Sequence, residues 1–256
     1  MDATEDSGRR RSFQQFRCEV PRADFSTAVR QLSKAQKTAS GVPAYTRFVN
    51  RPVGRLLAAA AHCMGLSPNQ VTAASGMASL AGITAIAFHR PSPALGCWVA
   101  LALLIGFALD SADGQLARLN RSASPSGEWM DHVVDCAKLL GIHAAVLISL
   151  HRFFDHLPPA LLLAPIAFQF AAVLLFFGGM LAGQLRTRRA AVDLRPSQPP
   201  SAVRGVALLP VDFGLLCLIF LFLGNERLFL ALYLSLLAAH LVFVPAFLVK
   251  WFRELS

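Results

Sequence analysis

The sequence contains few charged residues, which make up 15% of its 256 positions, whereas hydrophobic residues make up 55%. This composition excludes an ordinary soluble domain, because several apolar stretches exceed about 18 residues, enough to cross a bilayer. The five cysteines form no C-x-x-C pair and have no zinc-type spacing, so we expect neither a disulfide framework nor a zinc site. The sequence also lacks H-E-x-x-H, a Gly-rich phosphate loop and a Ser-His-Asp arrangement.

The amino-terminal region lacks the apolar core and cleavage site of a secretory signal peptide. Residues 1–41 are polar and basic instead, which predicts a mobile cytoplasmic tail. In residues 42–66, Arg47, Arg51 and Arg55 recur at helical spacing among apolar residues. This pattern is typical of an amphipathic helix at the membrane interface. Its arginines suit lipid headgroups, and contact with a substrate is the alternative.

Six apolar segments predict six membrane helices, so we expect an all-α, polytopic membrane protein. In chain order they are 71–88, 94–117, 130–150, 158–183, 205–223 and 228–249. Residues 67–250 would form one six-helix domain, and residues 251–256 would form a cytoplasmic carboxyl terminus.

Positive charge is unequally distributed between the two ends of these helices. Twenty of the 24 Lys and Arg residues lie on the side of the termini, whereas Arg90, Arg152 and Arg227 lie on the other side. Because basic residues accumulate on the cytoplasmic side, both termini should be cytoplasmic, in what we expect to be a bacterial plasma membrane. The net charge of +9 then indicates contact with anionic lipid headgroups and not with nucleic acid.

Four aspartates stand where the second predicted helix ends and the third begins. Asp110 and Asp113 are three residues apart, and Asp131 and Asp135 are four apart, so each pair shares a helix face. The short linker 119–127 would make the two helices antiparallel neighbours, and the pairs could then meet. Four carboxylates in apolar surroundings repel each other and lose hydration, which bound cations compensate. Oxygen ligands suit Mg²⁺ or Mn²⁺, and we expect two ions that bridge to substrate phosphates.

Small and basic residues accompany the aspartates. Gly114 and Ala117 would let a diphosphate approach the backbone, while Arg118 and Arg121 would donate hydrogen bonds to phosphate oxygens. The complete pattern is D-x2-D-G-x2-A-R-x8-G-x3-D-x3-D, with eight fixed positions over residues 110–135. Polar residues that merely cap two membrane helices would not explain four carboxylates in lipid.

This pattern resembles the signature of the CDP-alcohol phosphatidyltransferase family, and the resemblance covers roughly residues 44–250. It implies six membrane helices around a cytoplasm-facing polar cavity. It also implies transfer of a phosphatidyl group from a CDP-alcohol, most simply CDP-diacylglycerol, to the hydroxyl of a small polar acceptor, with release of CMP. Position for position, Asp110, Asp113 and Asp131 would bind metal, and Asp135 would be the general base and a further metal ligand.

The resemblance also implies contacts with the donor. The segment from Pro68 to Thr72 is similar to one that helps to line the family's nucleotide pocket, so Asn69 and Thr72 would lie on the cytidine side. A plain helix start is the alternative, because Pro68 precedes a long apolar run. The residues expected to contact the nucleotide or diphosphate are Asn69, Thr72, Asp113, Gly114, Ala117, Arg118 and Gly127.

The candidates for acceptor binding are basic residues near the aspartates, namely Arg121, Lys138, Arg186 and Arg204. Arg186 and Arg204 alternatively follow the positive-inside rule in a cytoplasmic loop, and Lys138 alternatively balances the carboxylates. The segment Arg47–Pro52 faintly resembles the inositol-phosphate branch of the family. Glycerol phosphate and inositol phosphate are therefore candidate acceptors, although serine and other alcohols share the same core.

Two other classes of function remain open. An intramembrane prenyltransferase also uses aspartates and Mg²⁺–diphosphate chemistry, but its two motifs usually lie far apart in the chain. A cation transporter also places carboxylates inside a bundle. It does not explain Gly114, Ala117, Arg118 and Gly127 at fixed spacing.

Two smaller features concern helix packing. Gly179-x-x-x-Gly183 allows close approach of helices, either within the bundle or in a homodimer, the state that the family resemblance implies. His132 and His143 have no metal-ligand spacing, and we expect both to be polar packing residues.

Overall fold

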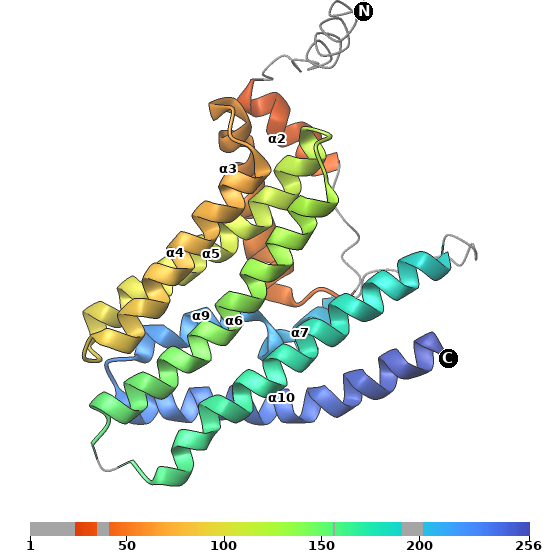
Figure 1. The fold of residues 1–256 in the computed structure, drawn as a ribbon. Helices are drawn as coiled ribbons and strands as arrows, with labels where there is room; N and C mark the ends of the chain where they lie inside the picture. Colours follow the sequence, from red (N-terminus) through yellow and green to blue (C-terminus); the bar gives the residue numbers. More distant parts are fainter. Residues whose placement is uncertain (1–23, 35–40, 156, 191–201) are drawn as a thin grey trace, which may run out of the picture.

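The structure, a computed structural model, describes residues 24–34, 41–155, 157–190 and 202–256, which form helices and no strand. Five of the helices are long and apolar enough to cross a membrane, and the prediction of an all-α, polytopic membrane protein is confirmed (Figure 1). These helices are α4 (Pro68–Phe88), α5 (Pro93–Leu119), α6 (Pro125–Phe153), α7 (Leu163–Ala190) and α10 (Glu226–Leu255).

The predicted count of six spanning helices is not confirmed, because the expected fifth segment is broken. It consists of α8 (Ala202–Ala207), η3 (Leu209–Val211), α9 (Phe213–Ile219) and η4 (Phe220–Phe222). Pro210 lies in the η3 turn, and Asp212 is the N-cap of α9, where its Oδ1 accepts a hydrogen bond from the Gly214 N–H at 3.0 Å. Both residues interrupt helical hydrogen bonding. The apolar helical part, Phe213–Phe222, is shorter than a membrane span.

Three of the long helices begin with serine followed by proline. Ser67, Ser92 and Ser124 are N-caps whose side-chain oxygens accept a hydrogen bond from a backbone N–H of the first turn. The prolines occupy the first helical position, where a missing N–H leaves no hydrogen bond unmade. The Ser124 cap starts α6 at Pro125, so the connection after α5 is shorter than the predicted 119–127 linker.

Shorter helices precede the first long one. Helix α2 (Phe25–Lys34) packs on α3 (Arg51–Met64) and lies inside the predicted tail, where the sequence pattern did not reveal it. Residues 1–23 and 35–40 of that tail lie outside the described residues. A π-helical turn, Thr46–Asn50, leads into α3, which packs along α5. The position of this segment at a membrane interface stays a prediction.

Helix α4 packs extensively against both α5 and α6 (Figure 1). Within the described chain, α5 and α6 contact each other far less than each contacts α4. The short connection nevertheless brings aspartates of the two helices together at one end, as predicted for three of the four, while most of the packing of both helices is against α4. Both helices pack on α4, and the aspartates lie between them.

Helices α7 and α10 pack against each other and complete the bundle. Gly178 and Gly179 lie against Trp251 of α10, and a Cβ added at Gly178 would lie 2.8 Å from Cζ3 of that side chain. A Cβ added at Gly183 would meet no atom within 4 Å. The small residues at 178 and 179 thus serve packing inside the chain, and a homodimer contact stays a prediction.

We expect Gly106→Ala to destabilise the protein. A Cβ at residue 106 would overlap Oγ of Ser79 and lie 3.0 Å from the Ser75 carbonyl oxygen, so the α4–α5 contact would have to open. Overpacking of this kind costs about 1–3 kcal/mol, which should lower the midpoint of thermal unfolding in detergent. Gly183→Ala is the matched control, since it makes the same helical substitution in open space. Equal midpoints for the two variants would contradict the packing described.

Candidate active site

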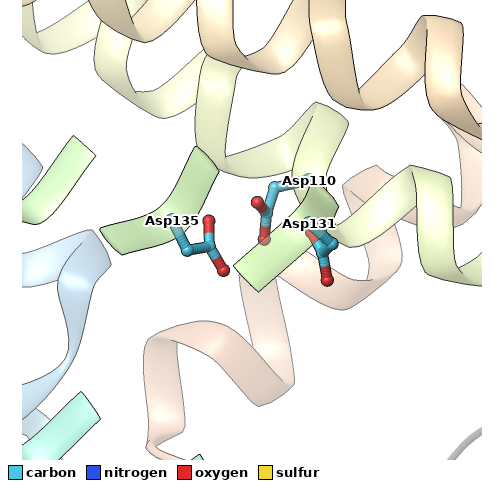
Figure 2. A group of neighbouring side chains, drawn as sticks. All are labelled: Asp110, Asp131 and Asp135. Carbon is cyan, nitrogen blue, oxygen red and sulfur yellow. The ribbon is translucent and has the colours of Figure 1, made fainter. Parts of the chain in front are cut away.

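Asp110 of α5 and Asp131 and Asp135 of α6 point toward one another (Figure 2). One carboxylate oxygen from each residue lies within 4.8 Å of the others. Asp131 and Asp135 are one helical turn apart and leave the same face of α6, while Asp110 approaches from the facing helix. Three convergent acidic oxygens are a ligand set that suits a divalent cation.

Asp113, the fourth aspartate, is directed elsewhere. Its side chain is buried, and its Oδ2 accepts a hydrogen bond from the Thr72 hydroxyl of α4 at 2.5 Å. The structure therefore brings three of the four predicted metal ligands together and ties the fourth to the neighbouring helix. Helical spacing alone placed Asp110 and Asp113 on one face but did not identify the Thr72 contact.

Lys138 lies among the carboxylates. Its Nζ donates hydrogen bonds to Oδ1 of Asp110 at 2.6 Å, to Oδ1 of Asp135 at 3.0 Å and to Oγ of Ser75 at 2.9 Å. An ammonium group has three N–H donors, so all three are used. The geometry is that of a counter-charge to the aspartates, and contact between Lys138 and an acceptor stays a prediction.

A cavity of about 410 Å³ opens on one side of the carboxylates. Its wall includes every residue that we expect to contact the donor, namely Asn69, Thr72, Asp113, Gly114, Ala117, Arg118 and Gly127. Asp131 lines the same cavity. Nε of Arg118 is buried and has no hydrogen-bond partner among the described residues, so a donor is available for an anionic ligand. The volume is in the range of small-molecule sites.

A second cavity, of about 340 Å³, opens on the other side of the carboxylates. Asp110, Asp135 and Lys138 belong to its polar lining, and much of its wall is aromatic. The aromatic residues are Phe107, Phe176, Phe213, Phe247 and Trp251. The carboxylate cluster thus stands between two cavities. Sequence reasoning missed the second cavity, because its wall comes from helices far apart in the chain.

A comparison with protein families identifies the chain. The model of the family described as CDP-alcohol phosphatidyltransferase matches residues 65–244, which is well over half of the chain and includes the whole aspartate pattern. The chain belongs to the CDP-alcohol phosphatidyltransferase family. A comparison with curated proteins gives no match.

Membership of the CDP-alcohol phosphatidyltransferase family confirms the resemblance inferred from the aspartate pattern. It supports an enzyme of the membrane that transfers a phosphatidyl group from a CDP-alcohol to an acceptor alcohol. Members of the family use divalent metal ions, and Asp110, Asp131 and Asp135 offer ligands for one.

Two of the arginines predicted to bind the acceptor of this transferase lie away from the cavities. Arg121 is exposed in the turn after α5, where its φ is 51°. Arg186 is also exposed, and its Nη1 donates to Oε2 of Glu254 at 2.8 Å. Neither is among the described residues that line the two cavities, so the structure gives their predicted role no geometric support. The side chain of Arg204 lies outside the described residues.

The arginine row before the transferase helices is partly buried. Burial lowers the pKa of Arg51, and the neighbouring charge of Arg47 lowers it further. Nη1 of Arg47 and Nε of Arg55 are buried without a hydrogen-bond partner among the described residues. Lipid headgroups and substrate phosphates would both satisfy such donors, so the two alternatives for this row remain.

The two histidines examined in the sequence lie in packing environments. Nδ1 of His143 is 2.7 Å from the Tyr233 hydroxyl, and its ring lies against Phe168 with the centroids 4.3 Å apart. The His132 ring contacts Phe176 edge-on and lies 3.8 Å from a carboxylate oxygen of Glu128. Neither histidine belongs to the metal-ligand group found among the described residues.

Proposed function

We propose that this protein transfers the phosphatidyl group of CDP-diacylglycerol to the hydroxyl of a small polar alcohol and releases CMP, as a step of phospholipid biosynthesis. The supporting observation is that Asp110, Asp131 and Asp135 stand between two cavities. The cavity lined by Arg118 would hold the nucleotide and diphosphate, and the cavity lined by Asp135 would admit the acceptor. Donor phosphorus and acceptor hydroxyl would then meet beside the carboxylates.

The donor set of the site fits Mg²⁺ or Mn²⁺, because its convergent ligands are carboxylate oxygens. Asp110, Asp131 and Asp135 would hold an ion, and Asp113 on the donor side would complete the set for the two ions that we propose. The bound ions would neutralise the diphosphate and make its phosphorus more electrophilic.

The residues of the first cavity would bind and orient the donor. The unpaired Nε of Arg118 can donate a hydrogen bond to a phosphate oxygen. Gly114 lies beside this guanidinium, where an added Cβ would meet only Nη1 of Arg118, at an ordinary contact distance of 3.6 Å, so the glycine leaves open space next to the proposed phosphate donor. Asn69 and Thr72 line the α4 side of the cavity, where we place the cytidine.

We assign Asp135 to take the proton from the acceptor. The acceptor oxygen forms a bond to phosphorus, the bond from phosphorus to the CMP oxygen breaks, and the hydroxyl proton passes to the Asp135 carboxylate. Asp135 lines the second cavity, whereas Asp131, one turn earlier on α6, lines the first. Lys138 fixes the carboxylate through its contact with Oδ1. A positioned base of this kind contributes roughly 10²–10⁴-fold in rate.

Glycerol phosphate and inositol phosphate are the acceptors that we propose first. Phosphorylated alcohols would find unpaired guanidinium N–H groups in the segment before α4, at Arg47 and Arg55, which lie outside the residues that line the two cavities. We further propose that the enzyme is a homodimer in a bacterial plasma membrane, with both termini and the site on the cytoplasmic side.

An acceptor panel tests the proposed function. Purified protein in detergent would receive CDP-diacylglycerol, Mn²⁺ and, in turn, glycerol phosphate, inositol phosphate, serine and other alcohols, with CMP and the lipid product both quantified. We expect CMP release that depends on one acceptor and equals the lipid product formed. Release of inorganic diphosphate from a prenyl diphosphate would favour the prenyltransferase alternative. Metal-ion uptake by vesicles without CMP release would favour the transporter.

A further inference from the structure

Lys138 is held among the carboxylates by three specific contacts. It is 5% exposed, and its partners Asp110, Asp135 and Ser75 come from α5, α6 and α4. Ser75 is itself fixed, since its hydroxyl donates to the Gly106 carbonyl oxygen at 2.7 Å. The ammonium group is therefore a fixed part of the helix packing and not a side chain that samples solvent.

The contacts of Lys138 have electrostatic consequences. Buried carboxylates without a counter-charge repel each other, and a buried ammonium without a partner loses its hydration. The ion pairs of Lys138 with Asp110 and Asp135, at 2.6 and 3.0 Å, relieve both costs at once. The same carboxylate groups would bind a divalent ion, so the ammonium and the metal share ligand residues and repel each other.

We propose that Lys138 is a built-in counter-cation of the metal site. It holds Asp110 and Asp135 in place when no divalent ion is bound, and it weakens the affinity of the site for such an ion. Lys138 is thus a positioning residue that acts through the aspartates. The inference rests on the metal binding included in the proposed function.

This arrangement couples metal binding to donor binding. A site that already contains one positive charge binds a divalent ion weakly when it is otherwise empty. The diphosphate of a CDP-alcohol adds negative charge in the adjoining cavity and strengthens binding of the ion. The site would therefore be loaded mainly by donor and metal together.

The direction of a change in Mn²⁺ affinity tests this inference. Mn²⁺ binding to the full-length protein in detergent, without donor, would be measured by electron paramagnetic resonance for wild type and for Lys138→Gln. Removal of the nearby positive charge should tighten Mn²⁺ binding by at least about tenfold. Lys250→Gln is the matched control, because Lys250 is exposed and lies 3.8 Å from a carboxylate oxygen of Glu254 outside the site. It should bind Mn²⁺ as wild type does.

If Lys138 had a merely structural role, Lys138→Gln would bind Mn²⁺ more weakly than wild type, because its aspartates would be disordered. Unchanged or weaker Mn²⁺ binding by Lys138→Gln would therefore overturn the inference while leaving the proposed function intact. If neither protein binds Mn²⁺ without donor, the inference is overturned, and if neither binds it with CDP-diacylglycerol added, the metal site of the proposed function is overturned as well.

Thermal unfolding gives a second readout. Wild type should unfold at nearly the same temperature in EDTA and in Mn²⁺, whereas Lys138→Gln should lose stability in EDTA and regain it in Mn²⁺. If Lys138→Gln does not fold in either buffer, the inference is tested with a double variant that combines Asp135→Asn with Lys138→Gln. This variant removes one charge of each sign. Recovery of folding would support the counter-cation, and continued failure would overturn it.

Discussion

Asp135→Asn should fold, bind CDP-diacylglycerol and metal, and release CMP at least about 100-fold more slowly than wild type. The physical reason is that an alcohol attacks phosphorus poorly unless its proton is removed as the new bond forms. Asp135 is the carboxylate of α6 that lines the second cavity, where we place the acceptor. Asparagine preserves the shape of the side chain and can remain close to Lys138, but its amide cannot take the proton.

Comparison with two other variants makes this result specific. Asp110→Ala should lose metal binding and turnover together, because it removes the ligand oxygen of one member of the convergent group, whereas Asp135→Asn keeps an amide oxygen that can still bind the ion. Asp155→Asn should behave as wild type, because Asp155 is exposed beyond the opposite end of α6. Donor binding would be followed by calorimetry and turnover by CMP release. If Asp135→Asn loses donor and metal binding as severely as Asp110→Ala, Asp135 is chiefly a ligand. Near-normal turnover would mean that another group takes the proton.

Much of the candidate site follows from sequence because its geometry is local. Asp131 and Asp135 share a face by helical spacing alone, and that face meets Asp110 in the structure. For a related reason, a single cavity is lined by all the residues that we expect to contact the donor. Most of them come from the end of α5 and the start of α6, which a short turn joins, so their neighbourhood depends little on the rest of the fold.

The features that sequence reasoning missed depend on contacts between distant segments. Asp113 bonds to Thr72 only because α4 packs beside α5. The same helix supplies Ser75 to Lys138, which the sequence left as either an acceptor contact or a counter-charge. Helical periodicity states which residues share a face but does not state which helix that face meets.

The broken fifth segment has a different cause. The average hydropathy over residues 205–223 is high enough to predict a membrane span. An average does not take account of two individual residues that interrupt a helix. Pro210 and Asp212 are separated only by Val211, and both oppose a continuous helix. Oxygens of Asp212 also accept hydrogen bonds from the Thr46 N–H at 3.0 Å and its hydroxyl at 2.9 Å. This tertiary contact holds the break in place, and it was invisible in the sequence.

Removal of divalent metal should abolish the reaction completely. The diphosphate of the donor and the carboxylates of Asp110, Asp131 and Asp135 all carry negative charge, and they would repel each other without cations between them. Lys138 provides only one positive charge, which its contacts with Asp110 and Asp135 already engage. Because the proposed role of Lys138 keeps the protein folded without metal, loss of activity in chelator should be reversible.

The most direct test is CMP release from CDP-diacylglycerol by the purified protein, with its best acceptor, first in EDTA and then after excess Mn²⁺ or Mg²⁺ is restored. Unchanged circular dichroism in EDTA would serve as the control for folding. We predict no CMP above the protein-free background in EDTA and recovery of the original rate when the metal returns. CMP release at the full rate in chelator would contradict a metal-dependent transfer at the Asp110–Asp131–Asp135 site.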